Sequence, residues 1–320
     1  MLNFLLRRLG ISVILLFFIS VVSFLIITLT PGSPYPWGEM NPKVSPQMKE
    51  NFRAKFHLDE PWYKQYYLNM KGLFTGTLTS IKDDRPVLQK IGERLPATLL
   101  LNILAITIAL SFGLMLGVYA ARHAGKLPDL LTCIVAFVFI ALPEFWIAGL
   151  IVIGLVKFTD APILGTQSYG VDFPNLFAMG LDRYWHLALP ATVLALGGIA
   201  AQALYIRASM VETMRQDYVR TARAKGLPQD VVFYKHALRN SIRPLITGIG
   251  GLLPALIGGS IIIETIFAYP GIGRMGYEAV LERDYPTLVA MNFIVASLVL
   301  LGNLISDILY AVVDPRVRLE

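Results

Sequence analysis

The chain has 320 residues, of which 55% are hydrophobic and only 16% are charged. Together with a mean hydropathy of +0.59, this composition excludes an ordinary soluble domain and indicates a polytopic membrane protein. The net charge of +6 does not indicate nucleic-acid binding, because no run of Lys and Arg interleaved with aromatic residues forms a groove for bases. The single cysteine, Cys133, excludes an internal disulfide.

Six apolar stretches are long enough to cross the hydrocarbon core of a bilayer, which takes about 20 helical residues. Because lipid offers no partners to backbone N–H and C=O groups, each stretch is expected to be a helix, and the fold class is all-α. The third stretch is long enough either to tilt or to break at Pro143. The six predicted spans are Leu9–Leu29, Ala97–Ala121, Leu130–Val156, Leu187–Ile206, Leu245–Phe267 and Leu288–Val313.

The distribution of Lys and Arg predicts that both termini lie inside the cell. With that orientation each side of the membrane holds fourteen of these residues, so the raw count does not decide. Ten of the outer ones, however, lie in Pro31–Leu95, a segment of 65 residues that is too long for the positive-inside rule to apply. Without this segment the inner side holds fourteen and the outer side four.

Three regions are predicted along the chain. Residues 1–30 form a transmembrane anchor, which we expect to be retained, because its apolar stretch is longer than that of a signal peptide and no small-residue cleavage pattern follows. Residues 31–95 form an external segment, and residues 96–320 form a core of five spans with a cytoplasmic loop at 207–243.

The two external segments differ in their predicted structure. The first begins with several prolines and continues with a more helical part, Gln47–Lys71. Its Trp and Tyr residues suit either the interfacial aromatic belt or a platform for an external partner. The second segment, Thr159–His186, contains Pro162, Gly165, Gly170 and Pro174 and is predicted to be a loop.

The most informative segment lies between the fourth and fifth predicted spans. It is predicted to form a short helix that ends at Gly226 in a left-handed cap, after which Pro228 begins a second helix running to about Asn240. Small Ala222 and Ala224 would let a partner approach the backbone closely. The alternative is a solvated basic loop of the positive-inside kind. The segment consists of Asp217, Tyr218, Val219, Arg220, Thr221, Ala222, Arg223, Ala224, Lys225 and Gly226.

No catalytic, nucleotide-binding or metal-binding constellation is found in the sequence. Gly271–Gly276 matches G-x-G-x-x-G, but it follows a predicted span rather than a strand, so we expect a structural turn at the outer surface. The chain has no phosphate-cradling G-x-x-x-x-G-K-[ST] motif, and its four His residues lack the spacing of metal ligands. We therefore predict a chain that is not an enzyme and holds no cofactor or metal itself.

Three acids lie in or near the predicted spans: Glu144, Glu264 and Asp307. Because ionisable groups in hydrocarbon are costly, they usually face a bundle interior or water, which makes these acids candidates for a translocation pathway. The alternative is a packed, hydrogen-bonded or protonated acid near an interface. In the second span, Gly113 and Gly117 form a GxxxG motif, which favours close helix packing. The alternative is a chance match, which is common in Gly-rich membrane helices.

The segment Arg220–Gly226, with the following His236–Asn240, resembles the cytoplasmic E-A-A-x-x-x-G loop of the inner-membrane permease subunits of dipeptide and oligopeptide ABC importers. Arg220 and Thr221 replace the Glu and first Ala of the general pattern, as in the peptide branch, so no role of that Glu is carried over. The resemblance extends over nearly the whole chain. Further matches are Phe4–Leu9, Arg94–Leu99, Pro143–Trp146, Glu264–Phe267, Tyr269–Arg274 and Asp307–Arg316.

The resemblance implies a type I ABC importer permease in the cytoplasmic (inner) membrane of a bacterium or archaeon. Its partners would be a second homologous permease, two ATPase subunits that bind ATP and Mg, and an external solute-binding protein. Residues 217–226 would then couple this chain to an ATPase, and the cargo would be di- or oligopeptides. The alternatives are glutathione, a nickel chelate or an oligosaccharide as cargo, or a stand-alone secondary transporter, which the lack of a clear internal repeat disfavours.

Overall fold

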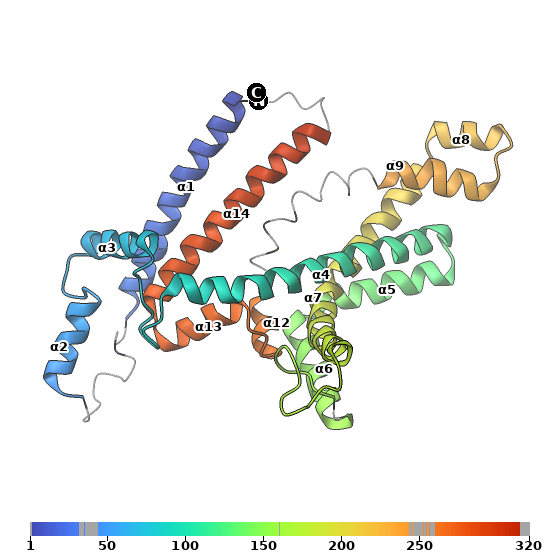
Figure 1. Cartoon of the computed structure of the whole chain (residues 1–320). Coiled ribbons are helices and arrows are strands. Elements are labelled where there is room, and N and C mark those ends of the chain that lie inside the picture. Colours follow the sequence, from blue (N-terminus) through green and yellow to red (C-terminus); the bar gives the residue numbers. More distant parts are fainter. Residues whose placement is uncertain are drawn as a thin grey trace. The chain divides into compact units, whose positions relative to one another are not determined.

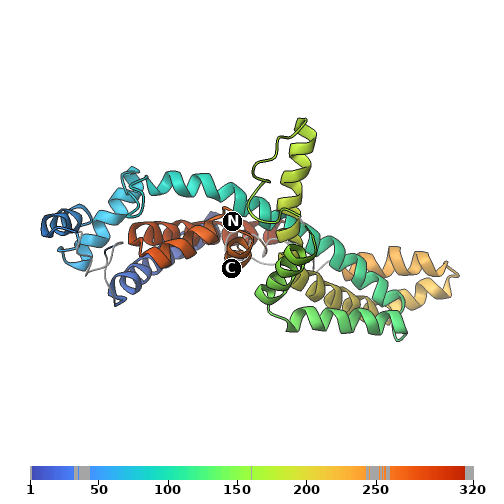
Figure 2. The ribbon, with the colours of Figure 1, turned by 90° about the horizontal axis from the view of Figure 1, so that it is seen from below.

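The described part of the chain is helical (Figures 1 and 2), apart from one isolated bridge between Thr79 and Pro86. This confirms the all-α prediction. The computed structural model describes residues 2–31, 35, 44–159, 161–242, 245, 252, 254, 256 and 260–313. Its helices are α1 Leu2–Leu29, α2 Pro46–Lys55, α3 Trp62–Thr75, α4 Val87–Arg122, α5 Leu127–Ala141, α6 Glu144–Phe158, α7 Leu176–Thr213, α8 Asp217–Ala224, the π-helix η1 Val231–Leu238, α9 Arg239–Ser241, α12 Ile261–Ile266, α13 Ile272–Glu282 and α14 Tyr285–Val313.

Among the residues that the structure describes, four helices are long and apolar enough to cross a membrane: α1, α4, α7 and α14. The helices α5 and α6 make a fifth candidate if they are counted together as one bent span. The predicted span Leu245–Phe267 falls largely outside the described residues, and its described end contains the short helix α12. The six-span count and the orientation therefore stay predictions.

The third predicted span is broken at Pro143, as one of the two alternatives anticipated. The helix α5 ends at Ala141, Leu142 is extended at φ −84° and ψ 131°, and α6 begins after Pro143. The two helices meet at an angle of 98°. Proline causes this break because it has no N–H for the helix ladder and it disfavours helical backbone at the residue before it.

The helix α7 begins at Leu176, well before the predicted start of the fourth span. The prediction of a loop over Thr159–His186 was therefore wrong from Leu176 onward. Asn175 caps the helix, because its side chain accepts a hydrogen bond of 2.8 Å from the Ala178 N–H. Asp182, Arg183 and His186 follow the apolar first turn of α7 and interrupt its apolar run, and this hid the helix from a search for long apolar stretches.

The glycine-rich motif at Gly271–Gly276 forms the start of α13 rather than the expected turn. Gly271 is the N-cap, and Ile272, Gly273 and Gly276 are buried. Gly276 leaves room for the Met291 side chain, because a Cβ there would lie 2.3 Å from the Met291 Cε and the methionine would have to move. The motif thus serves close packing between α13 and α14.

The chain divides into two compact units, of which the first holds residues up to Ala97 and those from Gly271 onward. In this unit α1 and α14 lie side by side (Figure 1). The short helix α3 packs on both of them. The buried core of this unit is formed by Phe24, Met70, Leu73, Val87, Ile91, Ile272, Met275, Val289 and Ala290.

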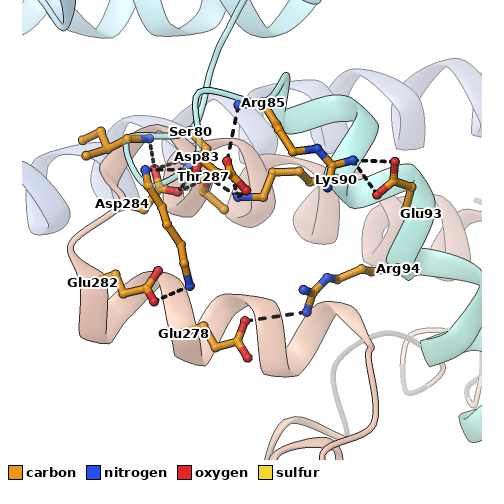
Figure 3. A network of polar contacts seen from close by, with 12 residues as sticks. Ser80, Asp83, Arg85, Lys90, Glu93, Arg94, Glu278, Glu282, Asp284 and Thr287 are labelled. Carbon is orange, nitrogen blue, oxygen red and sulfur yellow. Dashed lines mark hydrogen bonds and ion pairs between the residues drawn. The ribbon is translucent and has the colours of Figure 1, made fainter. Parts of the chain in front are cut away.

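A buried polar network in the first unit holds the loop before α4 to the turn before α14 (Figure 3). The Asp284 carboxylate accepts hydrogen bonds from the Ser80 hydroxyl at 2.5 Å and the Thr287 hydroxyl at 2.6 Å. Lys90 donates to the Ser80 hydroxyl at 2.9 Å and to Asp83 at 3.0 Å. Because Ser80, Asp284 and Thr287 are almost fully buried, every polar atom removed from this network leaves a partner unsatisfied.

Two charged groups of the same loop have pKa values shifted by their partners. A hydrogen bond to Glu282 raises the pKa of Lys82, so this contribution to stability is present below the usual pKa of 10.5 and is lost as the pH rises through the folded value. Burial alone would raise the pKa of Asp83, but hydrogen bonds from Lys90 and Ser80 outweigh it and lower the pKa. The Asp83 contribution is therefore present above its usual pKa of 3.8 and is lost as the pH falls. Both contributions are constant around neutral pH.

The second unit, Thr98–Pro270, contains a close contact between α4 and α7. A Cβ at Gly113 would lie 2.6 Å from the Gln202 Cβ, and a Cβ at Gly117 would lie 2.6 Å from the Ala203 carbonyl oxygen. Real Cβ contacts are not this short, so only glycine permits the observed separation of the two helices. This confirms the packing predicted from the GxxxG motif.

We expect Asp284→Ala to lower the stability of the chain by about 2–4 kcal/mol, because the buried Ser80 and Thr287 hydroxyls lose their acceptor. The exposed Asp59, which pairs with Arg53, gives the matched control Asp59→Ala, which we expect to change stability by less than about 0.5 kcal/mol. Thermal unfolding of the purified full chain measures both, and the difference from wild type should be the same at pH 6 and pH 8. An equal loss in both variants would contradict the role of the network.

We expect Gly117→Ala to lower stability by about 1–3 kcal/mol, because the new methyl group forces α4 away from Ala203 and Ile206. Gly154→Ala is the control, since a Cβ at this position in α6 meets nothing within 4 Å. The control should be neutral or slightly stabilising, because alanine favours a helix by about 1 kcal/mol. Retention of the monodisperse peak after heating reports both effects, and a Gly117→Ala variant as heat-resistant as Gly154→Ala would contradict the close contact.

Candidate functional site

The helix α8 forms as the sequence predicts. Asp217 lies in its first turn, where a negative charge is favourable. The helix ends at Ala224, and Gly226 follows at φ +75° with its N–H donating to the Arg223 carbonyl at 2.9 Å. The predicted left-handed glycine cap is thus confirmed.

The second helix of the hairpin also lies where it was expected, but its winding differs. Helical residues follow Pro228 and run to Ser241, close to the predicted end at Asn240. Within this stretch Val231–Leu238 is a π-helix. Such winding is rare and depends on tertiary contacts, so residue patterns did not predict it.

One edge of α8 is buried against the chain itself. Val219 is 0% exposed and Ala222 is 5% exposed, and both pack with Val232 of η1. The two residues lie three positions apart, which places them on one helical edge. The expectation that Ala222 is open to a partner was therefore wrong, because its methyl group fills the contact between the two helices of the hairpin.

The rest of α8 and its cap form an exposed basic surface. Arg220 pairs with Asp217 at 3.4 Å, but both side chains are largely exposed, so the pair contributes little stability. The surface is therefore free of strong contacts within the described part of the chain. Its residues are Asp217, Tyr218, Arg220, Thr221, Arg223, Ala224, Lys225 and Gly226.

The hairpin is attached to the end of α4 by Arg122. This guanidinium donates to the Asp230 carboxylate at 2.8 Å and to the Tyr234 hydroxyl at 2.7 Å. Beneath this contact Phe233 packs with Ile206 of α7 in a buried apolar cluster. Sequence reasoning missed Arg122 and Asp230, because they are 108 residues apart.

A second ion pair joins α5 to α7 near the same end of this unit. Arg207 donates to both oxygens of the Asp129 carboxylate, at 2.7 and 2.8 Å, and the Gly125 N–H donates to it at 2.9 Å. Asp129 is buried. Bidentate geometry of this kind fixes orientation as well as distance. In the sequence Arg207 was counted only as an inner positive charge.

Glu264 is fully buried and hydrogen-bonded within the second unit. Its carboxylate accepts from the Thr98 hydroxyl and from the Ser260 hydroxyl, each at 2.7 Å. The Asn102 side chain donates to the same serine hydroxyl at 3.0 Å. This environment favours the packed alternative for Glu264, and a pathway role stays a prediction.

The other two candidate acids lie in different surroundings. Glu144 is exposed at the start of α6, directly after the break at Pro143. Its Oε1 lies 3.5 Å from the position that a Cβ at Gly197 of α7 would take. In the first unit Asp307 pairs with Arg8 at 3.1 Å and is neutralised by it. Roles of Glu144 and Asp307 in a pathway stay predictions.

Two family models match almost the whole chain. The model described as "Binding-protein-dependent transport system inner membrane component" matches residues 113–319. The model described as "Binding-prot-dependent transport system membrane comp, N-term" matches residues 1–102. The segment that contains α8 and η1 lies within the first match.

Relatives of the chain match it from end to end. The oligopeptide transport system permease protein AppB of Bacillus subtilis (strain 168) is 39% identical over 318 residues, which cover 98% of this chain and 99% of the relative. The dipeptide transport system permease protein DppB of Alkalihalophilus pseudofirmus is 36% identical over 335 residues, covering 99% and 100%. The glutathione transport system permease protein GsiC of Escherichia coli (strain K12) is 34% identical over 319 residues, covering 99% of each. The chain therefore belongs to the binding-protein-dependent transport system inner membrane component family.

Proposed function

We propose that this chain is the permease subunit of an ATP-driven importer of peptides, and that α8 couples it to a cytoplasmic ATPase. The observation that carries the proposal is the exposed basic face of α8, on a helix whose opposite edge is fixed to its own chain. Family membership and the names of the relatives support the same function. ATP and Mg would be bound by the ATPase, so this chain would not itself be an enzyme.

Peptides are the favoured cargo. The relatives named for oligopeptides and dipeptides are 39% and 36% identical to this chain, and the relative named for glutathione is 34% identical. Glutathione, itself a short peptide in chemical terms, is the second candidate. The family description names dependence on a binding protein, which argues against a stand-alone secondary transporter.

The proposed assembly has a second homologous permease, two ATPase subunits and an external solute-binding protein, in the cytoplasmic (inner) membrane. The N-in, C-in orientation would place α8 and η1 in the cytoplasm, where an ATPase can reach them. It would also place the polar network around Asp284 outside. The excess of Lys and Arg around α8 supports this orientation.

Coupling would use the exposed face of α8 as a helix held in a groove of the ATPase. A displacement of α8 would pass to η1 through Val219 and Ala222, which are buried between them. From η1 it would reach α4 through the Arg122–Asp230 pair. The hairpin would therefore transmit force to two long helices, α4 and α7, rather than move alone.

We expect Ala222→Asp and Ala224→Asp to fail in different ways. Ala222→Asp buries a charge between α8 and η1, which should loosen α8 by several kcal/mol. Ala224→Asp places the same charge on the exposed face, which should leave α8 folded and weaken ATPase binding. Limited trypsin cleavage at the Arg and Lys residues of α8 in the purified chain measures the first effect, and co-purification of the ATPase measures the second.

The two aspartate variants also distinguish the proposed ATPase contact from the alternative that this segment is only a solvated basic loop. If α8 only carries charge, Ala224→Asp should co-purify with the ATPase as well as wild type. If trypsin cuts the Ala222→Asp variant no faster than the Ala224→Asp variant, the buried edge of α8 is not what fixes this helix to η1.

We expect Gly226→Val to uncouple transport from ATP hydrolysis, and Gly226→Asn to retain most of the coupling. At φ +75° a β-branched residue is strained by about 1–3 kcal/mol, whereas asparagine tolerates this conformation. No atom lies within 4 Å of the added Cβ, so the contrast reports backbone conformation rather than collision. Peptide uptake and peptide-stimulated ATPase activity in the reconstituted complex are the measurements.

Two outcomes would count against this account. Wild-type uptake in Gly226→Val would show that the cap is not needed for coupling. Equal loss in both variants would show that the glycine serves a purpose other than its left-handed backbone. The orientation is checked in the same vesicles with single cysteines at the exposed Lys225 and Lys82, which a membrane-impermeant thiol reagent should label from opposite sides.

A further inference from the structure

A cavity of about 480 Å³ lies between the α4–α5 turn, the end of α7 and the α8–η1 hairpin. We name it the basic pocket, because its wall holds four Lys or Arg side chains and a single carboxylate. The carboxylate is Asp230, which already pairs with Arg122 at 2.8 Å. Four bases against one acid leave an excess of three positive charges. The four bases are Arg122, Lys126, Arg215 and Arg223.

Three of these bases, Lys126, Arg215 and Arg223, are exposed. Within the residues that the structure places, none of them has a carboxylate partner. Like charges that share one cavity repel each other, and a bound anion relieves the repulsion. Arg and Lys donors are the usual partners of phosphate oxygens. The basic pocket therefore fits a ligand that carries a phosphate group.

A second cavity, of about 380 Å³, lies among α4, α5 and α7. We name it the apolar groove, because every side chain that lines it is hydrocarbon except that of Thr132. It is long in the direction of the helices, since its wall on α5 runs from Leu131 to Phe139. Such a surface suits an acyl chain and offers nothing to a soluble anion.

The two cavities follow the same faces of the same helices. Leu116 of α4 lines the apolar groove, and His123, seven residues later in the turn that directly follows α4, lines the basic pocket. On α7, Ala203 and Val211 are related in the same way. Intervals of seven and eight residues return to one helical face after about 10–12 Å.

The boundary between the cavities coincides with the end of the apolar surface of these helices. Lys126 of the basic pocket directly precedes Leu127, which is 66% exposed, and Leu130 in the next turn is 57% exposed. On α4, Tyr119 is exposed one turn before His123, and tyrosine favours the membrane interface. Exposed leucines on a membrane helix contact lipid, so the basic pocket lies at the level of the lipid headgroups.

We propose that the basic pocket and the apolar groove together bind one anionic phospholipid of the cytoplasmic leaflet, with its phosphate in the pocket and an acyl chain in the groove. A free phosphate would use only the pocket, and an ATPase would contact only the hairpin, so neither accounts for the groove. Because Arg223 lies in α8 and in the wall of the pocket, the lipid would contact the proposed coupling helix. The lipid site goes beyond the proposed transport function and does not depend on the identity of the cargo.

The test compares two double variants of the full chain, purified in mild detergent and mixed with defined lipids. Lys126→Gln with Arg215→Gln removes two charges from the pocket and leaves α8 unchanged. Lys235→Gln with Arg239→Gln removes two exposed charges that do not line it. The probes are phosphatidylglycerol and phosphatidylcholine with identical acyl chains, and native mass spectrometry counts the lipid retained. Gel filtration confirms that each variant is folded.

We expect wild type and the Lys235/Arg239 variant to retain phosphatidylglycerol in preference to phosphatidylcholine. The Lys126/Arg215 variant should retain about tenfold less phosphatidylglycerol, because it lacks two positive charges that each attract an anionic lipid. Wild-type retention should also fall as the salt concentration rises, which gives a second measure that needs no variant.

Four results would overturn the lipid site: equal retention of both lipids by wild type, retention that does not depend on salt, equal losses in the two variants, or displacement of the lipid by sn-glycerol 3-phosphate at equal concentration. The last would identify a site for free phosphate. A Lys126/Arg215 variant that keeps its lipid but no longer co-purifies with the ATPase would assign the pocket to the protein partner. Failure of the lipid test alone would leave the coupling proposal intact, because that proposal is measured by uptake with variants at Gly226.

Discussion

The Arg122 guanidinium holds the α8–η1 hairpin to the last turn of α4, and the proposed coupling depends on this contact. It bonds Asp230 and Tyr234 at 2.8 and 2.7 Å and lies 5.4 Å from the centroid of the tyrosine ring. Because these groups are exposed, their electrostatic energy is small, and the buried packing of Phe233 against Ile206 supplies most of the attachment. Arg122 fixes the orientation of the hairpin, because the hairpin cannot turn about the end of α7 without breaking both of these hydrogen bonds.

Features decided by one or two residues could be predicted from the sequence. Pro143 breaks the third span, Gly226 takes a left-handed conformation, and Gly113 with Gly117 allows α7 to approach α4. In each case the backbone chemistry of proline or glycine permits few alternatives. The family resemblance rested on longer sequence motifs. It was confirmed by two family models that match residues 1–102 and 113–319.

Features decided by contacts between distant residues could not be predicted. Ala222 was expected to face a partner, but the side on which α8 packs is set by Val232, which no local pattern reveals. Ser80 and Asp284 form a buried bond across 204 residues of sequence. The first turns of α7 were mistaken for a loop, because Asp182 and Arg183 interrupt their apolar run and hydropathy does not register the cap at Asn175. The segment proposed for coupling was therefore located in the sequence, whereas its exposed face was defined only by the fold.

The polar contacts of the second unit restrict how a movement of α8 could spread. The buried Asp129 and the partly exposed Arg207 must stay together, because separating them would leave the Asp129 charge buried without a partner. The helices α5 and α7 should accordingly move together, while Arg122 makes α4 follow the hairpin. The least constrained point of these helices is then the break at Pro143, where the α5 ladder stops and α6 starts at 98°. If α8 moves as proposed, the angle between α5 and α6 is the degree of freedom that can absorb the motion, and the exposed Glu144 lies directly at it.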